Sequence, residues 1–252
     1  MSGDVLVCLQ EDIQTIHHKI KGQLLIKAGH VGDYAHLEFS PMDNFIHPAV
    51  VLTVGRLYNC RSPKLLSLGA IVQFIFMASQ IHKQIPETVV QSHTIDPKDG
   101  TQFPVLVGDY LYGKFFTTLC DAGLLKYLQP LAEIIGYIHE GGILKKVNQN
   151  RLNNQIVSEV TRLEVAELLA GAASIAGDVV GAPREDQMLL YEFGLNLGMV
   201  YGLSQGKSYD ILTHYNQAKL RLDKLPNQSE KIIFEHLLQR IQLNDGMARK
   251  VV

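Results

Sequence analysis

A long segment without charge constrains the fold more than any other feature of this chain. No Asp, Glu, Lys or Arg occurs between Lys64 and Lys83. The segment has roughly the shortest length that crosses a membrane, but Ser67, Gln73 and Ser79 interrupt its apolar run, and no second segment of this kind follows. The pattern favours a helix buried at the centre of a large helical domain over a membrane span.

The rest of the chain also shows helical periodicity. Apolar residues recur at spacings of three and four from Leu124 to Ile138, and again from Val105 to Leu119. Ser62-Pro63 matches a helix N-cap followed by a proline in the first turn. Small residues from Ala166 to Gly177 would let neighbouring helices approach closely. Since no strand pattern, repeat or linker interrupts this series, we expect a single all-α domain over residues 1–252.

The composition argues against several classes of function. A net charge of −2 and a pI near 6.5 give no basic field that would bind nucleic acid. The cysteines and histidines are scattered, without the spacing of a disulfide framework or a metal site. No cationic segment followed by an apolar stretch begins the chain. We therefore expect a cytoplasmic protein with no bound metal, no membrane span and no nucleic-acid partner.

Five short segments, in order along the chain, resemble motifs of the trans-isoprenyl (polyprenyl) diphosphate synthases. The segment 105–116 (VLVGDYLYGKFF) resembles the family's "LVGDYLxxxAF" helix, and the segment 72–82 (VQFIFMASQIH) resembles its "VELIHTASLIHDD" helix. The segments that stand in the places of "KRLRP", "EGE" and "FGxxLG" are Asn44 to Pro48, Glu140-Gly141 and Phe193 to Gly198. The resemblance covers residues 44–210 and implies the orthogonal helical bundle of the isoprenoid synthase type.

The chemistry implied by this resemblance depends on acidic residues. Such enzymes ionise an allylic diphosphate, and isopentenyl diphosphate attacks the resulting carbocation. Two DDxxD motifs on facing helices bind the Mg²⁺ ions that hold the leaving diphosphate, because Mg²⁺ requires hard oxygen ligands. In this chain the positions of the first motif read Lys83, Gln84 and Glu87, and those of the second read Gln205, Gly206 and Tyr209. Only Glu87 retains a carboxylate, so no catalytic residue and no cofactor are expected; Mg²⁺ would belong to a catalytic partner.

The positions that would bind the diphosphate groups are altered as well. The "KRLRP" positions read Asn44 and His47, and the family's "KT" pair reads Glu164 and Val165, which reverses the charge. The last position of the "GExxQ" motif reads Lys145. A site without cation ligands and without phosphate-binding cations is not expected to ionise a diphosphate.

Three hypotheses follow from the resemblance. The first is a non-catalytic subunit that completes a dimer with a DDxxD-containing homologue and tunes product chain length in quinone side-chain synthesis. The second is a weak prenyltransferase with an altered site that includes Glu87. The third is a pseudoenzyme that binds a prenyl lipid or acts as a scaffold. Whether the chain is an enzyme, and whether it forms a homodimer, stays open at this point.

The resemblance also implies a subunit interface and a tunnel. The expected interface residues lie on two successive helices and are Tyr112, Phe115, Phe116, Leu119 and Leu128. The expected tunnel lining lies just before the first motif and consists of Phe74, Ile75, Ala78 and Ser79. Small side chains at two of these positions would leave an apolar channel open for a prenyl chain, unless other side chains fill it.

Overall fold

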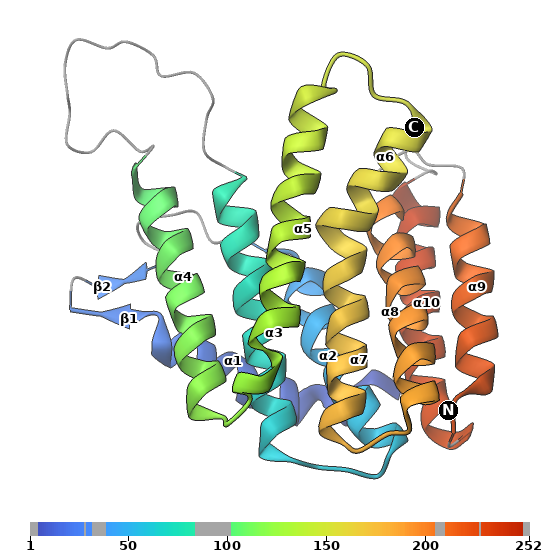
Figure 1. Ribbon diagram of the computed structural model, residues 1–252. Helices are drawn as coiled ribbons and strands as arrows, with labels where there is room; N and C mark the ends of the chain where they lie inside the picture. Colours follow the sequence, from blue (N-terminus) through green and yellow to red (C-terminus); the bar gives the residue numbers. More distant parts are fainter. Residues whose placement is uncertain are drawn as a thin grey trace.

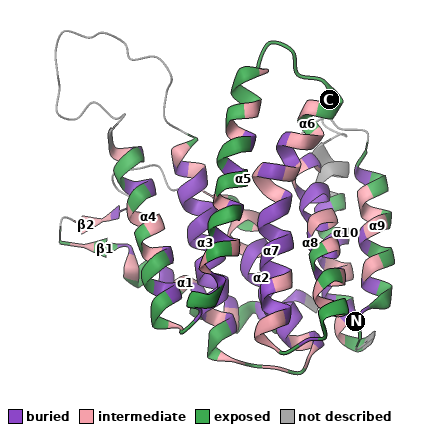
Figure 2. Ribbon diagram, viewed as in Figure 1, coloured by how far each residue is buried: buried purple, intermediate pink, exposed green. Residues whose placement is uncertain are grey.

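The charge-free segment forms helix α3, Pro63–His82, as its sequence predicts. The Ser62 side chain accepts a hydrogen bond from the Lys64 amide, and Pro63 occupies the first helical turn. Of the residues that the structure describes, this helix alone is long and apolar enough to cross a membrane, but 83% of that apolar window is buried inside the protein. In Figure 2 it is coloured as buried along most of its length, which identifies it as a core helix.

Helices make up almost the whole of the computed structural model, which describes residues 5–27, 29–31, 39–83, 102–204, 210–226 and 228–248 (Figure 1). A short 3₁₀ turn, Val5–Leu9, precedes the first helix, and a second one, Leu125–Tyr127, precedes α5. The helices other than α3 are α1 Gln10–Gln23, α2 Pro41–Leu57, α4 Gln102–Asp121, α5 Leu128–Val147, α6 Asn154–Thr161, α7 Glu167–Val179, α8 Arg184–Ser204, α9 Ile211–Lys224 and α10 Gln228–Ala248. The all-α prediction is confirmed.

One small departure is a two-stranded antiparallel hairpin, β1 Leu25–Ile26 and β2 Gly29–His30. Each strand has two residues, so neither can show the alternation that identifies a strand in a sequence. The hairpin lies beside α1 at the edge of the bundle (Figure 1).

Close packing of α7 against α8 places the small-residue helix at the centre of the bundle, as expected. Glycines of α8 face this helix and the turn before it. A Cβ atom on Gly198 would come within 2.5 Å of the Ala166 Cα, and one on Gly194 within 2.6 Å of the Leu169 carbonyl oxygen. The two backbones therefore meet at a distance that only glycine allows.

We expect Gly198→Ala to destabilise the protein by about 2 kcal/mol, because its methyl group would push two backbones apart. Gly113 provides the matched control, since a Cβ on this α4 residue would meet nothing within 4 Å. Gly113→Ala should stabilise the chain by roughly 0.5 to 1 kcal/mol through helix propensity alone. Urea unfolding of both variants checks the pair; equal effects would contradict this account of the α7–α8 contact.

The predicted interface is wrong for two of its five residues. Phe115 and Leu119 are completely buried, because their side of α4 packs against α3 within the same chain. Phe116 is 47% exposed, whereas Tyr112 and Leu128 are partly buried. A helix turns by about 100° per residue, so adjacent phenylalanines cannot share one face. Only the outer side of α4 is available to a partner.

Candidate functional site

Four elements that are distant in sequence surround one pocket. They are the start of α2, the end of α3, the π-helical turn Arg162–Ala166 before α7, and α8. The cavity has a volume of about 300 Å³. Its lining residues are Phe39, Asp43, His47, Phe76, Gln80, Lys83, Glu164, Val165, Leu168 and Tyr201. The pocket thus brings together four positions selected from the sequence: His47, Lys83, Glu164 and Val165.

Asp43 fixes the start of α2 at one wall of the pocket. Its backbone amide donates to the Ser40 hydroxyl at 3.1 Å, while its carboxylate accepts from the Ser40 amide at 3.0 Å, which completes a capping box. The other carboxylate oxygen accepts a hydrogen bond from the Tyr201 hydroxyl of α8. Asp43 therefore holds α2 against α8 and has a structural role.

His47 lies deeper in the same wall and is neutral at physiological pH. Its ring packs at 4.4 Å from the Phe76 ring, and its Nδ1 atom lies 3.3 Å from the Asp43 carbonyl oxygen, an arrangement that requires a proton on Nδ1. Burial lowers the pKa of His47 to about 4, with the hydrogen bond to the Asp43 backbone opposing the shift. The histidine that stands in place of a phosphate-binding arginine therefore supplies no positive charge.

This buried histidine should make the protein less stable in acid. Between an unfolded pKa of 6.5 and a folded pKa of about 4, the unfolded chain binds more protons than the folded one. Stability is therefore intact above this window and falls as the pH drops through it, by about 2 kcal/mol between pH 7 and pH 5. Urea unfolding of His47→Phe should lose most of this dependence, whereas a variant of the exposed His18 (His18→Asn) should keep it. Equal pH dependence in wild type and His47→Phe would contradict the prediction.

An ion pair between Lys83 and Glu164 lines the pocket. Lys83 Nζ lies 3.2 Å from Glu164 Oε2, and the two side chains are 30% and 9% exposed. Burial lowers the pKa of Lys83, and the nearby Lys145 lowers it further, while Glu164 acts in the opposite direction. The pair therefore lies in a partly desolvated place, where a partner for each charge is required.

The resemblance places both residues of this ion pair at positions that would carry the family's chemistry. In the alignment that the resemblance implies, Lys83 takes the place of the family's first aspartate, and Glu164 takes the place of the lysine of its "KT" pair. Both charges are reversed, and the two side chains bind each other across the pocket. The amine repels Mg²⁺ and is already paired, and the carboxylate repels a diphosphate. The described residues therefore do not fit a magnesium-diphosphate complex.

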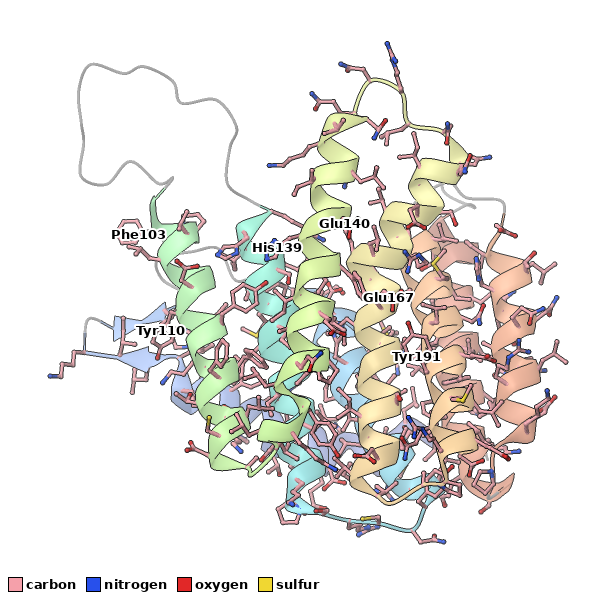
Figure 3. The ribbon with its side chains drawn as sticks, in the orientation of Figure 1. Phe103, Tyr110, His139, Glu140, Glu167 and Tyr191 are labelled. Atoms are coloured by element: carbon pink, nitrogen blue, oxygen red, sulfur yellow. The ribbon has the colours of Figure 1, made fainter. Side chains whose placement is uncertain are left out.

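A network of charged side chains, of which Glu167 alone is buried, supports the turn that carries Glu164. Arg162 donates to both oxygens of Glu159, at 2.7 and 3.0 Å, and also pairs with Glu167. Glu167 is 4% exposed and accepts a hydrogen bond from the Tyr191 hydroxyl at 2.5 Å (Figure 3). π-helical turns of this kind are frequent at functional sites. None of these residues was expected from the sequence motifs; the spacing of three between Glu159 and Arg162 is the local signal that could find the pair.

The other predicted site residues do not line this pocket. The Asn44 side chain donates to the carbonyl oxygens of Phe39 and Ser40, both at 3.3 Å, so it helps to fix the start of α2. Lys145 lies exposed on α5. The remaining motif positions, Gln84, Glu87, Gln205, Gly206 and Tyr209, lie outside the described residues. Within the described ranges, no group of three His, Cys, Asp or Glu residues could hold a metal ion.

Protein atoms fill the expected tunnel at its floor. Phe74, Ile75 and Ala78 have no exposed surface, and Ser79 is 3% exposed. The Ser79 hydroxyl donates to the Ile75 carbonyl oxygen at 2.8 Å and lies 3.1 Å from the Tyr112 hydroxyl. An open channel would leave accessible surface on its lining. This burial supports the close-packed alternative over an open channel at these four residues.

Comparisons with known proteins agree with the fold. No protein-family model matches the chain. It is 26% identical over 184 residues to the octaprenyl diphosphate synthase of Escherichia coli K12, an alignment that covers 71% of this chain and 55% of that protein. It is 22% identical over 201 residues to heptaprenyl diphosphate synthase component 2 of Geobacillus stearothermophilus, covering 78% of this chain and 63% of that protein. Its structure superposes on a decaprenyl diphosphate synthase from Rhodobacter capsulatus with a TM-score of 0.77 at 20% identity, covering 94% and 96% of the two chains.

The chain resembles the trans-isoprenyl diphosphate synthases in sequence and shares their fold. The resemblance seen in the sequence is thereby confirmed, and so is the isoprenoid synthase fold. The alignments span about 55% and 63% of the length of the two curated relatives. Given this resemblance, the charges in the pocket are the feature to explain.

Proposed function

We propose that this chain is a non-catalytic subunit of a heteromeric polyprenyl diphosphate synthase, acting in the cytoplasm. It would complete a dimer with a DDxxD-containing homologue and tune the length of the prenyl product. The observation that carries the proposal is the ion pair between Lys83 and Glu164, because it fills with opposite charges the place where metal and diphosphate would bind. A relative named as one component of a heptaprenyl diphosphate synthase supports a heteromeric assembly.

The outer surfaces of α4 and α5 support the same proposal. Leu106 and Phe116 of α4 are 62% and 47% exposed, and Tyr137 of α5 is 40% exposed. Gly113 and Gly136 lie on these helices with open space around them, so a partner helix could approach closely. Exposed apolar residues of this size are typical of an interaction surface.

The experiment that tests the proposal measures prenyl transfer with Mg²⁺, an allylic diphosphate and labelled isopentenyl diphosphate. The chain alone should give no product above the buffer background. The chain mixed with a DDxxD-containing homologue from the same genome should give more product, or longer product, than the homologue alone. Both results follow if this chain contributes structure and the homologue contributes the metal site.

Two outcomes would contradict the proposal. Turnover by the chain alone, abolished by Glu87→Gln, would establish a weak enzyme instead. A mixture whose rate and product length equal those of the homologue alone, together with separate elution of the two chains, would remove the subunit role.

A further inference from the structure

The end of the α5–α6 hairpin has a composition unlike the rest of the chain. Between Glu140 and Glu159 the charged residues are Lys145, Lys146 and Arg151, and all three are basic. The protein as a whole carries a net charge of −2, so this segment concentrates positive charge on an acidic molecule. We call residues 141–158 the hairpin tip.

Apolar side chains are exposed among these basic residues. Val147 is 78% exposed, Ile143 62% and Leu152 48%. Large aliphatic groups in water are unfavourable, and here they lie close together in sequence on one projecting part of the fold. The tip therefore presents apolar groups interleaved with positive charge.

The shape of the tip favours an extended surface over a groove as its binding partner. In Figure 1 the hairpin rises beyond the ends of the neighbouring helices, and Figure 2 colours most of it as exposed. A projecting end can enter a soft interface to a shallow depth without a matching cavity. Positive charge beside exposed aliphatic groups is the combination that binds the headgroup region of anionic bilayers.

We propose that the hairpin tip docks this protein on the surface of a bilayer that contains anionic lipid. Val147 and Leu152 would enter the headgroup region, and Lys145 and Arg151 would contact lipid phosphates. This is peripheral binding of one end of the molecule, and it does not depend on the subunit role proposed above.

Docking in this way would orient the pocket. The end of α3, which forms one wall of the pocket, lies at the same end of the bundle as the hairpin tip (Figure 1). The bilayer would then lie at the end of the bundle that carries the end of α3, while the outer faces of α4 and α5 stay free for a partner chain.

Vesicle flotation tests the proposal with the full chain and its variants. The probes are vesicles of phosphatidylcholine alone and of an equal mixture of phosphatidylcholine and phosphatidylglycerol. Wild type should float with the anionic vesicles and dissociate as salt is raised. Each basic residue near the surface contributes roughly fivefold in affinity, so Lys145→Gln/Arg151→Gln should lose at least tenfold on anionic vesicles. Val147→Glu/Leu152→Glu should lose binding altogether.

The control is Leu212→Glu, which alters an equally exposed leucine (61%) on α9 and should bind vesicles like wild type. Equal binding of wild type to neutral and anionic vesicles would overturn the proposal, as would equal binding of the tip variants and the Leu212→Glu control. Loss of association between a homologous partner chain and the tip variants, with vesicle binding unchanged, would also overturn it and would identify the tip as a protein contact. Circular dichroism confirms that each variant is folded.

Discussion

Two adjacent phenylalanines are expected to give opposite results when substituted. Phe115→Ala should destabilise the chain by about 4 kcal/mol, because this side chain is completely buried and its removal leaves a cavity. Phe116→Glu should leave stability within about 1 kcal/mol of wild type, since this side chain is 47% exposed and its ring meets that of Phe115 at 4.8 Å. The same substitution should weaken association with the partner chain by at least roughly 30-fold, as expected when a charge replaces an aromatic contact.

Sedimentation of the mixed chains measures the association, and urea unfolding measures the stability. Leu220→Glu is the control, because Leu220 is 50% exposed on α9 and lies outside the proposed interface. If Phe116→Glu associated as well as wild type, the partner would bind elsewhere on the molecule. If Phe115→Ala unfolded at the same urea concentration as wild type, Phe115 could not be buried where α4 packs against α3.

The second large effect concerns the ion pair between Lys83 and Glu164 in the pocket. Lys83→Glu and Glu164→Lys should each cost about 2 kcal/mol, because each places two like charges in a partly buried contact. This value is reduced for the solvent that reaches Lys83, which is 30% exposed. The double reversal, Lys83→Glu with Glu164→Lys, restores opposite charges and should recover most of the loss.

A double-mutant cycle built from these variants gives the coupling energy. The pair Lys126 and Asp178 serves as the comparison, because its atoms are 2.7 Å apart but its side chains are 66% and 40% exposed. Exposed pairs of this kind are worth less than about 1 kcal/mol. If the cycle at Lys83 and Glu164 gave no more than the comparison pair, the ion pair would be a surface contact with no bearing on the pocket. None of the variants should restore prenyl transfer, since the second aspartate-rich motif is also altered.

The helices of this fold are predictable from the sequence because their signals are local. The N-cap at Ser62, the proline after it and the charge-free run of α3 all act within one helix, so they can be read without knowledge of the rest. The small residues of α7 also predict close packing, because small side chains allow it in any helical bundle. Hairpin β1–β2 lacks such a signal, since two residues per strand carry no periodicity.

The site is less predictable because its geometry depends on residues that are far apart in the chain. The sequence shows Lys83 and Glu164 as two separate losses of family chemistry, and only the fold brings them to 3.2 Å. The predicted interface is wrong at Phe115 and Leu119 for a related reason. Apolar periodicity indicates that one face of a helix is buried, but it does not indicate whether the same chain or a partner chain buries that face.

The ion pair also constrains which substitutions its two positions tolerate. The arrangement that the resemblance implies has an acid at position 83 and a lysine at position 164. Changing position 83 first places two acids together, and changing position 164 first places two lysines together. Either single substitution is expected to make the protein less stable, because it replaces an attraction with a repulsion. The two positions are therefore expected to change together, since only a double exchange keeps opposite charges in contact.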